Sequence, residues 1–128
     1  MTPEIAFGLV AKPAFVRTDE RGTFEELVNA GRWESLIHGH MRRGAVLGHH
    51  YHAHTIVCYY LLEGRARITT VEVTTAARSE VVIQAGQGFV FRPEEARAIE
   101  HLEDSRFVML KSHRFDPAAP DLIPYAVR

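Results

Sequence analysis

Residues 44–64 read GAVLGHHYHAHTIVCYYLLEG, and this stretch indicates how the chain folds. It holds two runs of strand length, at 45–51 and 56–62, separated by a short polar segment. Short runs with period-two alternation between turn residues are typical of β-strands, and no long stretch has the i, i+3, i+4, i+7 apolar spacing of a helix. Strands are expected at 5–10, 22–28, 35–41, 45–51, 56–62, 65–73, 80–83, 88–91, 98–102 and 106–111.

Ten short strands in a chain of 128 residues predict an all-β fold, either a closed barrel or a sandwich. Turn residues separate the strands at 19–22, 63–64, 84–88 and 103–105. One short helical turn is expected near 29–33, and the last fifteen or so residues are expected to be an irregular tail. The length and the absence of a linker predict a single domain over residues 1–128.

The composition excludes several classes of protein. Fifteen Lys and Arg balance sixteen Asp and Glu to a net charge of −1, which does not favour a nucleic-acid partner. The single cysteine, Cys58, can form no disulfide within the chain, which fits a reducing cytoplasm. The first fifteen residues carry an acid and two prolines without a sustained apolar run, so neither a signal peptide nor a membrane partner is expected.

Histidines are concentrated in one part of the sequence. Six of the eight lie between positions 38 and 54, at His38, His40, His49, His50, His52 and His54. Residues two apart on a strand share a face, so His50, His52 and His54 are expected on one side and His49 on the other. Imidazoles that converge in this way can hold Zn, Fe, Ni or Cu, although unrelated polar residues on a sheet would give the same pattern.

The spacing of these residues resembles the cupins, small jelly-roll β-barrels. The first cupin motif, G(x)5HxH(x)3-4E(x)6G, fits Gly44, His50, His52 and Gly64, but Val57 stands where metal-binding cupins have a glutamate. The second motif falls on GFVFRP at 88–93, and its histidine position lands on Arg97 or Ala98. The resemblance therefore implies a single-domain cupin more strongly than it implies a metal.

A closer resemblance links the chain to nucleotide-sugar cupins. DERGTFEE at 19–26 resembles the D-x-R-G-x-F-x-E opening of dTDP-4-dehydrorhamnose 3,5-epimerases, and GHHYH at 48–52 resembles their R-G-x-H-Y-x strand. The tail, with RFDP at 114–117, is similar to the C-terminal cupin domain of capsular-polysaccharide sugar-nucleotide enzymes. The implied activity is epimerisation or isomerisation of a nucleotide-linked keto-sugar, by removal of a proton beside the carbonyl.

Such a reaction needs a base, a partner for the enolate oxygen and an acid. By the resemblance, His50 takes the position of the base. Tyr59 is the candidate acid if a turn near 53–55 resets the alternation; without that turn Tyr60 faces the pocket instead. A carboxylate to pair with the base has no counterpart in the sequence. Candidates for binding the substrate are Tyr51, Arg67 and Arg97.

Two alternative functions follow from the same residues. In a metal-dependent cupin, such as a polyketide cyclase or an oxygenase, His50, His52, His54 and His101 would hold a divalent Zn, Fe or Ni ion. In a binding protein without turnover, the loss of ligands at Val57 and Arg97 would be expected. All three functions depend on a barrel that brings His50 and His52 together inside a cavity. Small cupins commonly pair, so the resemblance also implies a homodimer, in which an exposed strand at 5–10 would find a partner.

Overall fold

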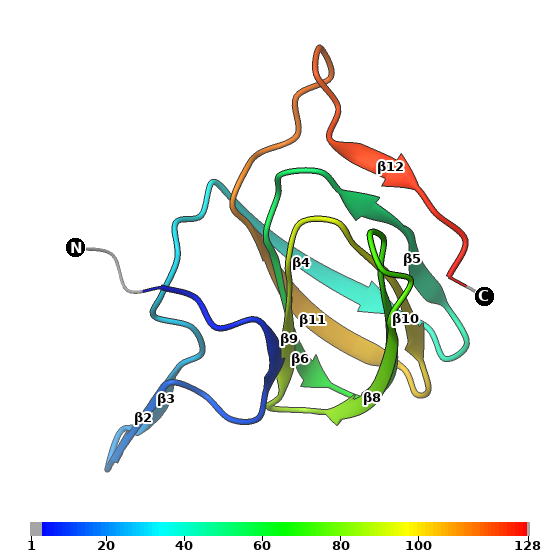
Figure 1. Cartoon of the computed structure of the whole chain (residues 1–128). Helices are drawn as coiled ribbons and strands as arrows, with labels where there is room; N and C mark the ends of the chain where they lie inside the picture. Colours follow the sequence, from blue (N-terminus) through cyan, green and yellow to red (C-terminus); the bar gives the residue numbers. More distant parts are fainter. Residues whose placement is uncertain (1–3, 128) are drawn as a thin grey trace.

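The computed structural model describes residues 4–127, which form an all-β structure of two facing sheets and one separate hairpin (Figure 1). Every strand pair within these residues is antiparallel. The strands are β1 (Gly8–Val10), β2 (Phe15–Asp19), β3 (Gly22–Glu26), β4 (Ser35–Met41), β5 (Val46–His52), β6 (Val57–Glu63), β7 (Arg65–Glu72), β8 (Arg78–Gln84), β9 (Gly88–Phe91), β10 (Glu95–His101), β11 (Ser105–Lys111) and β12 (Leu122–Pro124).

The first sheet has the strand order β1-β9-β6-β11-β4, and the second has the order β12-β5-β10-β7-β8. Apolar side chains from both sheets meet between them and make the core. On β6, for example, Val57, Tyr59 and Leu61 are all 2% exposed or less and belong to this core. The turn near 53–55 therefore resets the alternation, and of the two alternatives left open by the sequence it is Tyr59, not Tyr60, that joins this core.

Ten of the twelve strands coincide with the expected ones, and β2 and β12 were not expected. The hairpin of β2 and β3 extends away from the sheets (Figure 1), and its residues are mostly exposed, so no apolar pattern marks β2 in the sequence. The tail is irregular except at β12, which pairs with the edge of β5. The helical turn expected near 29–33 is wrong. Within residues 4–127 there is no helix; Gly31 has a φ of 85°, and Trp33 Nε1 donates to the Ala30 carbonyl oxygen across a bend.

A β-bulge in β5 decides which histidines face the interior. Arg97 of β10 pairs with His50, and the next residue, Ala98, pairs with Gly48, so His49 is an extra residue in the ladder. Gly48 and His49 have φ values of 112° and 56°. The extra residue shifts the alternation by one, and His50 therefore joins Leu47 on the inner face. A regular strand with Leu47 inside would have turned His50 outward.

Gly48 is needed for this bulge. A Cβ atom at this position would overlap the backbone carbonyl oxygen of Arg97, which lies across the ladder. Its positive φ also disfavours every residue with a side chain. The dipeptide Gly48–His49 thus places His50 and His52 inside the barrel.

Candidate functional site

The bulge directs His50 and His52 into an inner cavity of about 140 Å³ at one end of the space between the sheets. The expected convergence of these two rings is confirmed, because both line the cavity and their centroids lie 5.3 Å apart. Arg97 of β10 and Lys111 of β11 line the same cavity. The two histidines and Arg97 come from one sheet and Lys111 from the other, so the cavity brings both sheets together at this end.

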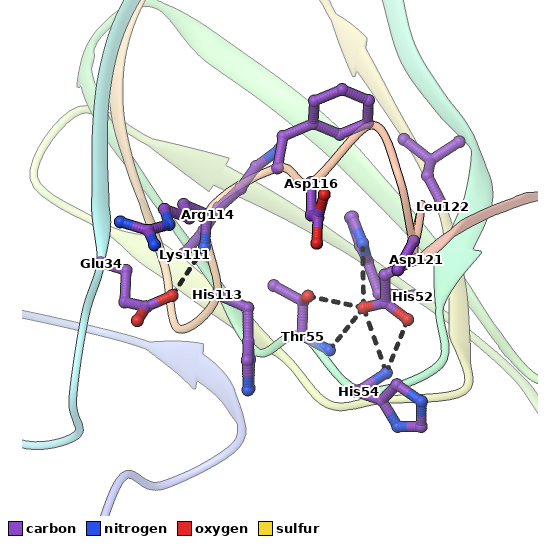
Figure 2. A pocket seen from close by; sticks show the side chains of 12 residues that line it. Glu34, His52, His54, Thr55, Lys111, His113, Arg114, Asp116, Asp121 and Leu122 are labelled. Atoms are coloured by element: carbon purple, nitrogen blue, oxygen red, sulfur yellow. Dashed lines mark hydrogen bonds and ion pairs between the residues drawn. The ribbon is translucent and has the colours of Figure 1, made fainter.

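A second, outer cavity of about 320 Å³ adjoins the first, and its lining side chains are drawn in Figure 2. His52, Lys111 and Leu122 line both cavities, which makes them neighbouring compartments of one site. The remaining wall of the outer cavity comes from Glu34, from the loop after β5 and from the segment between β11 and β12. A ligand larger than the inner cavity therefore has room to extend outward.

His50 has the hydrogen-bond geometry of a neutral imidazole with one nitrogen free. Its Nδ1 lies 3.1 Å from the carbonyl oxygen of Gly48. A carbonyl oxygen only accepts, so Nδ1 carries the proton and Nε2 keeps its lone pair. Burial, and after it the charge of Arg97, lowers the pKa of His50. The ring is therefore neutral near pH 7 and able to accept a proton.

His52 lies beside a carboxylate that the sequence did not reveal. Its Nδ1 is 3.7 Å from Oδ2 of Asp121, an ion-pair distance that is too long for a hydrogen bond (Figure 2). This Nδ1 is buried and has no hydrogen-bond partner among residues 4–127. Burial, and then Arg97, lowers the pKa of His52 to about 4. Asp121 thus brings a carboxylate to the site, but it faces His52 and not His50, the expected base.

Asp121 is held in place by the loop after β5. Its carboxylate accepts hydrogen bonds from the backbone N–H groups of Ala53, His54 and Thr55, at 2.9–3.2 Å, and from the Thr55 hydroxyl at 2.6 Å (Figure 2). Burial alone would raise the pKa of Asp121, but these hydrogen bonds lower it below its ordinary value. The carboxylate therefore stays ionised and ties the last strand to the loop that follows the two histidines.

Several residues proposed from the sequence lie away from this site. Tyr59 points inward but lines neither cavity; its hydroxyl bonds to Nε2 of His101 at 2.8 Å in the core, and burial raises its pKa. Tyr51 packs on the outer face of the second sheet, against a small apolar cluster with Tyr125. Arg67 is also on that face and pairs with Glu100 at 2.7 Å and Glu80 at 3.4 Å. Of the three substrate-binding candidates, only Arg97 faces the cavity.

The four histidines expected to hold a metal do not come together. His54 lies in the loop after β5 with an exposed side chain, and both ring nitrogens of His101 are within hydrogen-bond distance of Tyr59 or of the Ala45 carbonyl. No group of three or more His, Cys, Asp or Glu in residues 4–127 is arranged to hold a metal ion. The guanidinium of Arg97 also places a positive charge beside His50 and His52. The residues present therefore do not fit a divalent cation.

Comparison with known proteins agrees with this architecture. Residues 17–123 match the model of a family described as the polysaccharide biosynthesis C-terminal domain. The chain belongs to this family. Among curated proteins, none matches the sequence.

Within residues 4–127 there is also no helix long and apolar enough to cross a membrane.

Solved structures confirm the cupin fold of this family member. The crystal structure of dTDP-6-deoxy-D-glucose-3,5-epimerase RmlC from Legionella pneumophila, in complex with dTDP-4-keto-L-rhamnose, superposes with a TM-score of 0.73 at 16% identity; the match covers 91% of this chain and 70% of that one. ChmJ, a 3'-monoepimerase from Streptomyces bikiniensis in complex with dTDP-quinovose, gives a TM-score of 0.72 at 20% identity, over 92% and 70% of the two chains.

The capsular polysaccharide assembling protein CapF from Staphylococcus aureus is a third similar structure. It superposes with a TM-score of 0.68 at 21% identity, and the match covers 88% of this chain. The chain spans about a third of the length of CapF, since the match covers 32% of that protein. These similarities establish the jelly-roll architecture.

Two residues of the site escaped sequence interpretation. Lys111 ends the expected strand 106–111, in step with the inward-facing Phe107 and Met109, so the alternation could have placed it in the interior. Asp121 follows Pro120 in a tail expected to be irregular, and no periodic signal marks it. Its role depends on contacts with residues 66 to 68 positions earlier in the chain.

Proposed function

We propose that this chain binds a nucleotide-linked keto-sugar at the open end of the barrel and epimerises a carbon beside its carbonyl group. The observation that carries the proposal is the inner cavity, where the free nitrogen of a neutral histidine shares a small space with two cationic side chains. Two of the similar structures are named as sugar epimerases, and their printed ligands are dTDP-sugars. The sugar would occupy the inner cavity and the rest of the ligand the outer one.

His50 is the proposed base. Its Nε2 would take the proton from the C–H beside the carbonyl, and the electron pair would move to the carbonyl oxygen to form an enolate. The lowered pKa of His50 keeps the ring unprotonated at neutral pH. The same low pKa makes the ring a weaker base, so the reaction also needs strong stabilisation of the enolate.

Lys111 is proposed to act from the opposite sheet. Its ammonium group would stabilise the negative enolate oxygen, and the nearby charge of Arg97 would add to the positive potential of the inner cavity. Burial, and then Arg97, lowers the pKa of Lys111, which makes it a better proton donor than an exposed lysine. Lys111 would return a proton to the other face of the carbon, and solvent would reset both groups. Lys111 would thus serve as the acid, the role for which the sequence suggested Tyr59.

His52 is proposed as a positioning residue that acts through Asp121. The 3.7 Å separation of Nδ1 and Oδ2 would shorten to a hydrogen bond once a ligand fills the cavity, as is common for sites that tighten on binding. That bond would fix the His52 ring against the ligand and hold the loop after β5 closed.

Solvent exchange tests the proposed function. The chain is incubated in D2O with dTDP-4-keto-6-deoxyglucose and, separately, with a nucleotide-linked keto-sugar that carries a carboxylate, and deuterium uptake by each sugar is followed by mass spectrometry. We expect uptake at a carbon beside the carbonyl, and a loss of about a hundredfold or more in His50→Ala, because the base is removed. His38→Ala is the matched control, since His38 lies on β4 outside both cavities. No uptake by the wild-type chain, or equal uptake by His50→Ala, contradicts the proposal.

A further inference from the structure

Arg97 is a buried cation that forms no ion pair within residues 4–127. Its side chain belongs to a residue only 3% exposed, and its guanidinium carbon lies 4.3 Å from the centre of the Phe91 ring. One terminal nitrogen donates to the backbone carbonyl of Glu95 at 2.9 Å. Its Nε is buried and makes no hydrogen bond within residues 4–127. The Glu95 carboxylate, the acid nearest in sequence, accepts instead from the backbone N–H of Arg92.

Among the described residues, only Glu95 offsets part of the charge of Arg97, through space and without an ion pair, and the side chains of the inner cavity add further positive charge. Lys111 lines the same inner cavity, and no Asp or Glu within residues 4–127 does so. Asp121 lines only the outer cavity, where it is held by the loop after β5. Arg97 forms no ion pair with any carboxylate in the described part of the chain.

An unpaired buried charge destabilises a fold, so a fold tolerates it where a ligand supplies the opposite charge. A ligand carboxylate carries its charge for as long as the ligand is bound, whereas an enolate forms only during turnover. A guanidinium with an unused Nε–H presents the flat fork that a carboxylate matches. The cavity of about 140 Å³ has room for a small planar anion and part of a sugar ring, and the rest of the ligand fits the adjoining outer cavity.

We propose that the inner cavity binds a carboxylate of the ligand on Arg97, so that the sugar is an acidic one of the uronate class. The inference deepens the proposed function and rests on it, because it assigns the substrate class for the same site. The histidine position of the second cupin motif falls on Arg97 or Ala98, and of these two only Arg97 lines the inner cavity. In this proposal the guanidinium supplies the cation that binds an oxygen group of the ligand.

Binding measured without turnover tests this assignment separately from catalysis. The Nε–H resonance of Arg97 is followed by ¹⁵N NMR while D-glucuronate, D-glucose, acetate or inorganic phosphate is added to the full chain. Glucuronate carries a carboxylate at the position where glucose carries a hydroxymethyl group. We expect glucuronate to bind at least about tenfold more tightly than glucose, since a charge-assisted hydrogen bond is at stake, and both carboxylates to shift the Nε–H signal.

Two variants separate recognition from folding. Arg97→Gln removes the charge and should make glucuronate bind no better than glucose. Arg97→Lys keeps the charge but loses the planar, two-donor geometry of the guanidinium, and should retain part of the preference for glucuronate over glucose. Arg67→Gln is the matched control, because Arg67 is a paired arginine on the outer face and should leave binding unchanged. Thermal melts establish that each variant is folded.

The outcomes are distinct for the two proposals. Equal binding of glucuronate and glucose by the wild-type chain overturns the carboxylate assignment, as does an Nε–H signal that only phosphate shifts, which would assign the cavity to a phosphate group. Preferential carboxylate binding by Arg97 without any deuterium uptake by keto-sugars supports the assignment and contradicts the proposed epimerase activity. Deuterium uptake by keto-sugars without preferential carboxylate binding supports the epimerase activity and contradicts the carboxylate assignment.

Discussion

The space between the sheets has two ends, and each holds a buried histidine in a different condition. At the closed end, His101 is 0% exposed and both ring nitrogens have partners, the Tyr59 hydroxyl at 2.8 Å and the Ala45 carbonyl at 3.0 Å. At the open end, His52 is 5% exposed and its Nδ1 has no hydrogen bond within residues 4–127. The comparison distinguishes a histidine whose hydrogen bonds are all made within the fold from one that keeps an unused nitrogen at a cavity, where the proposed ligand would bind.

The largest effect is expected at the closed end. His101→Ala should lower the free energy of unfolding by about 4 kcal/mol, because it opens a cavity and leaves the Tyr59 hydroxyl without a partner. Urea denaturation measures this loss. His38→Ala on the exposed face of β4 should change stability by less than about 0.5 kcal/mol. A loss in His101→Ala no larger than in His38→Ala would remove the distinction between the two ends.

The bulge that creates the open end is the next most sensitive feature. Gly48→Ala should cost about 3 kcal/mol, because the residue has a positive φ and its new Cβ would overlap the Arg97 carbonyl oxygen. Gly44→Ala is the control: its φ is 90° but no atom lies within 4 Å of a Cβ there, so only the backbone strain of about 1 kcal/mol is expected. Equal losses in the two variants, measured by urea denaturation, would show that the close approach is unimportant.

The open end should also yield a substitution that stabilises the protein. Arg97→Met removes an unpaired buried charge and keeps an unbranched side chain against Phe91, so stability should rise by about 1 kcal/mol while carboxylate binding is lost. Arg67→Met on the outer face breaks an exposed ion pair and should lower stability slightly or leave it unchanged. A fall in the melting temperature of Arg97→Met would mean that the guanidinium is already satisfied without a ligand.

The last prediction concerns the pH dependence of stability. His52 titrates at about 4 in the folded chain and near 6.5 when unfolded, first because of burial and then because of Arg97. Between these values the unfolded chain binds the extra proton, so stability is full above pH 6.5 and falls as the pH drops toward 4. His52→Gln should flatten this decline, and His54→Gln, in the exposed loop, should not. Identical pH profiles for wild type and His52→Gln would contradict the attribution of this loss of stability to His52.

The sequence was most informative where alternation is regular. The run 56–62 places Val57, Tyr59 and Leu61 in the core, because one turn resets the alternation and the remaining residues follow it. The pair His50 and His52 was also assigned correctly to one face, although that result depends on the bulge at His49, which no apolar pattern announces. Local periodicity therefore predicted the fold and part of the site.

What escaped prediction depends on contacts between distant residues. Tyr59 faces inward as expected, yet its depth in the barrel, beside His101 and not beside His50, follows from how the strands are staggered. Asp121 reaches the site because three residues of the tail pair with the edge of β5. Arg67 and Arg97 lie on the neighbouring strands β7 and β10. Only the bulge and the strand register decide that Arg67 is paired on the surface and Arg97 is enclosed.

The hydrogen bonds of Asp121 have a consequence for the order of assembly. The carboxylate joins the tail to backbone amides 66 to 68 positions earlier, so the pocket closes only after β12 has docked beside β5. A chain whose sandwich has already collapsed therefore still lacks one wall of its ligand chamber. Forming this contact joins residues more than sixty positions apart, so it carries the conformational entropy cost of closing a long loop.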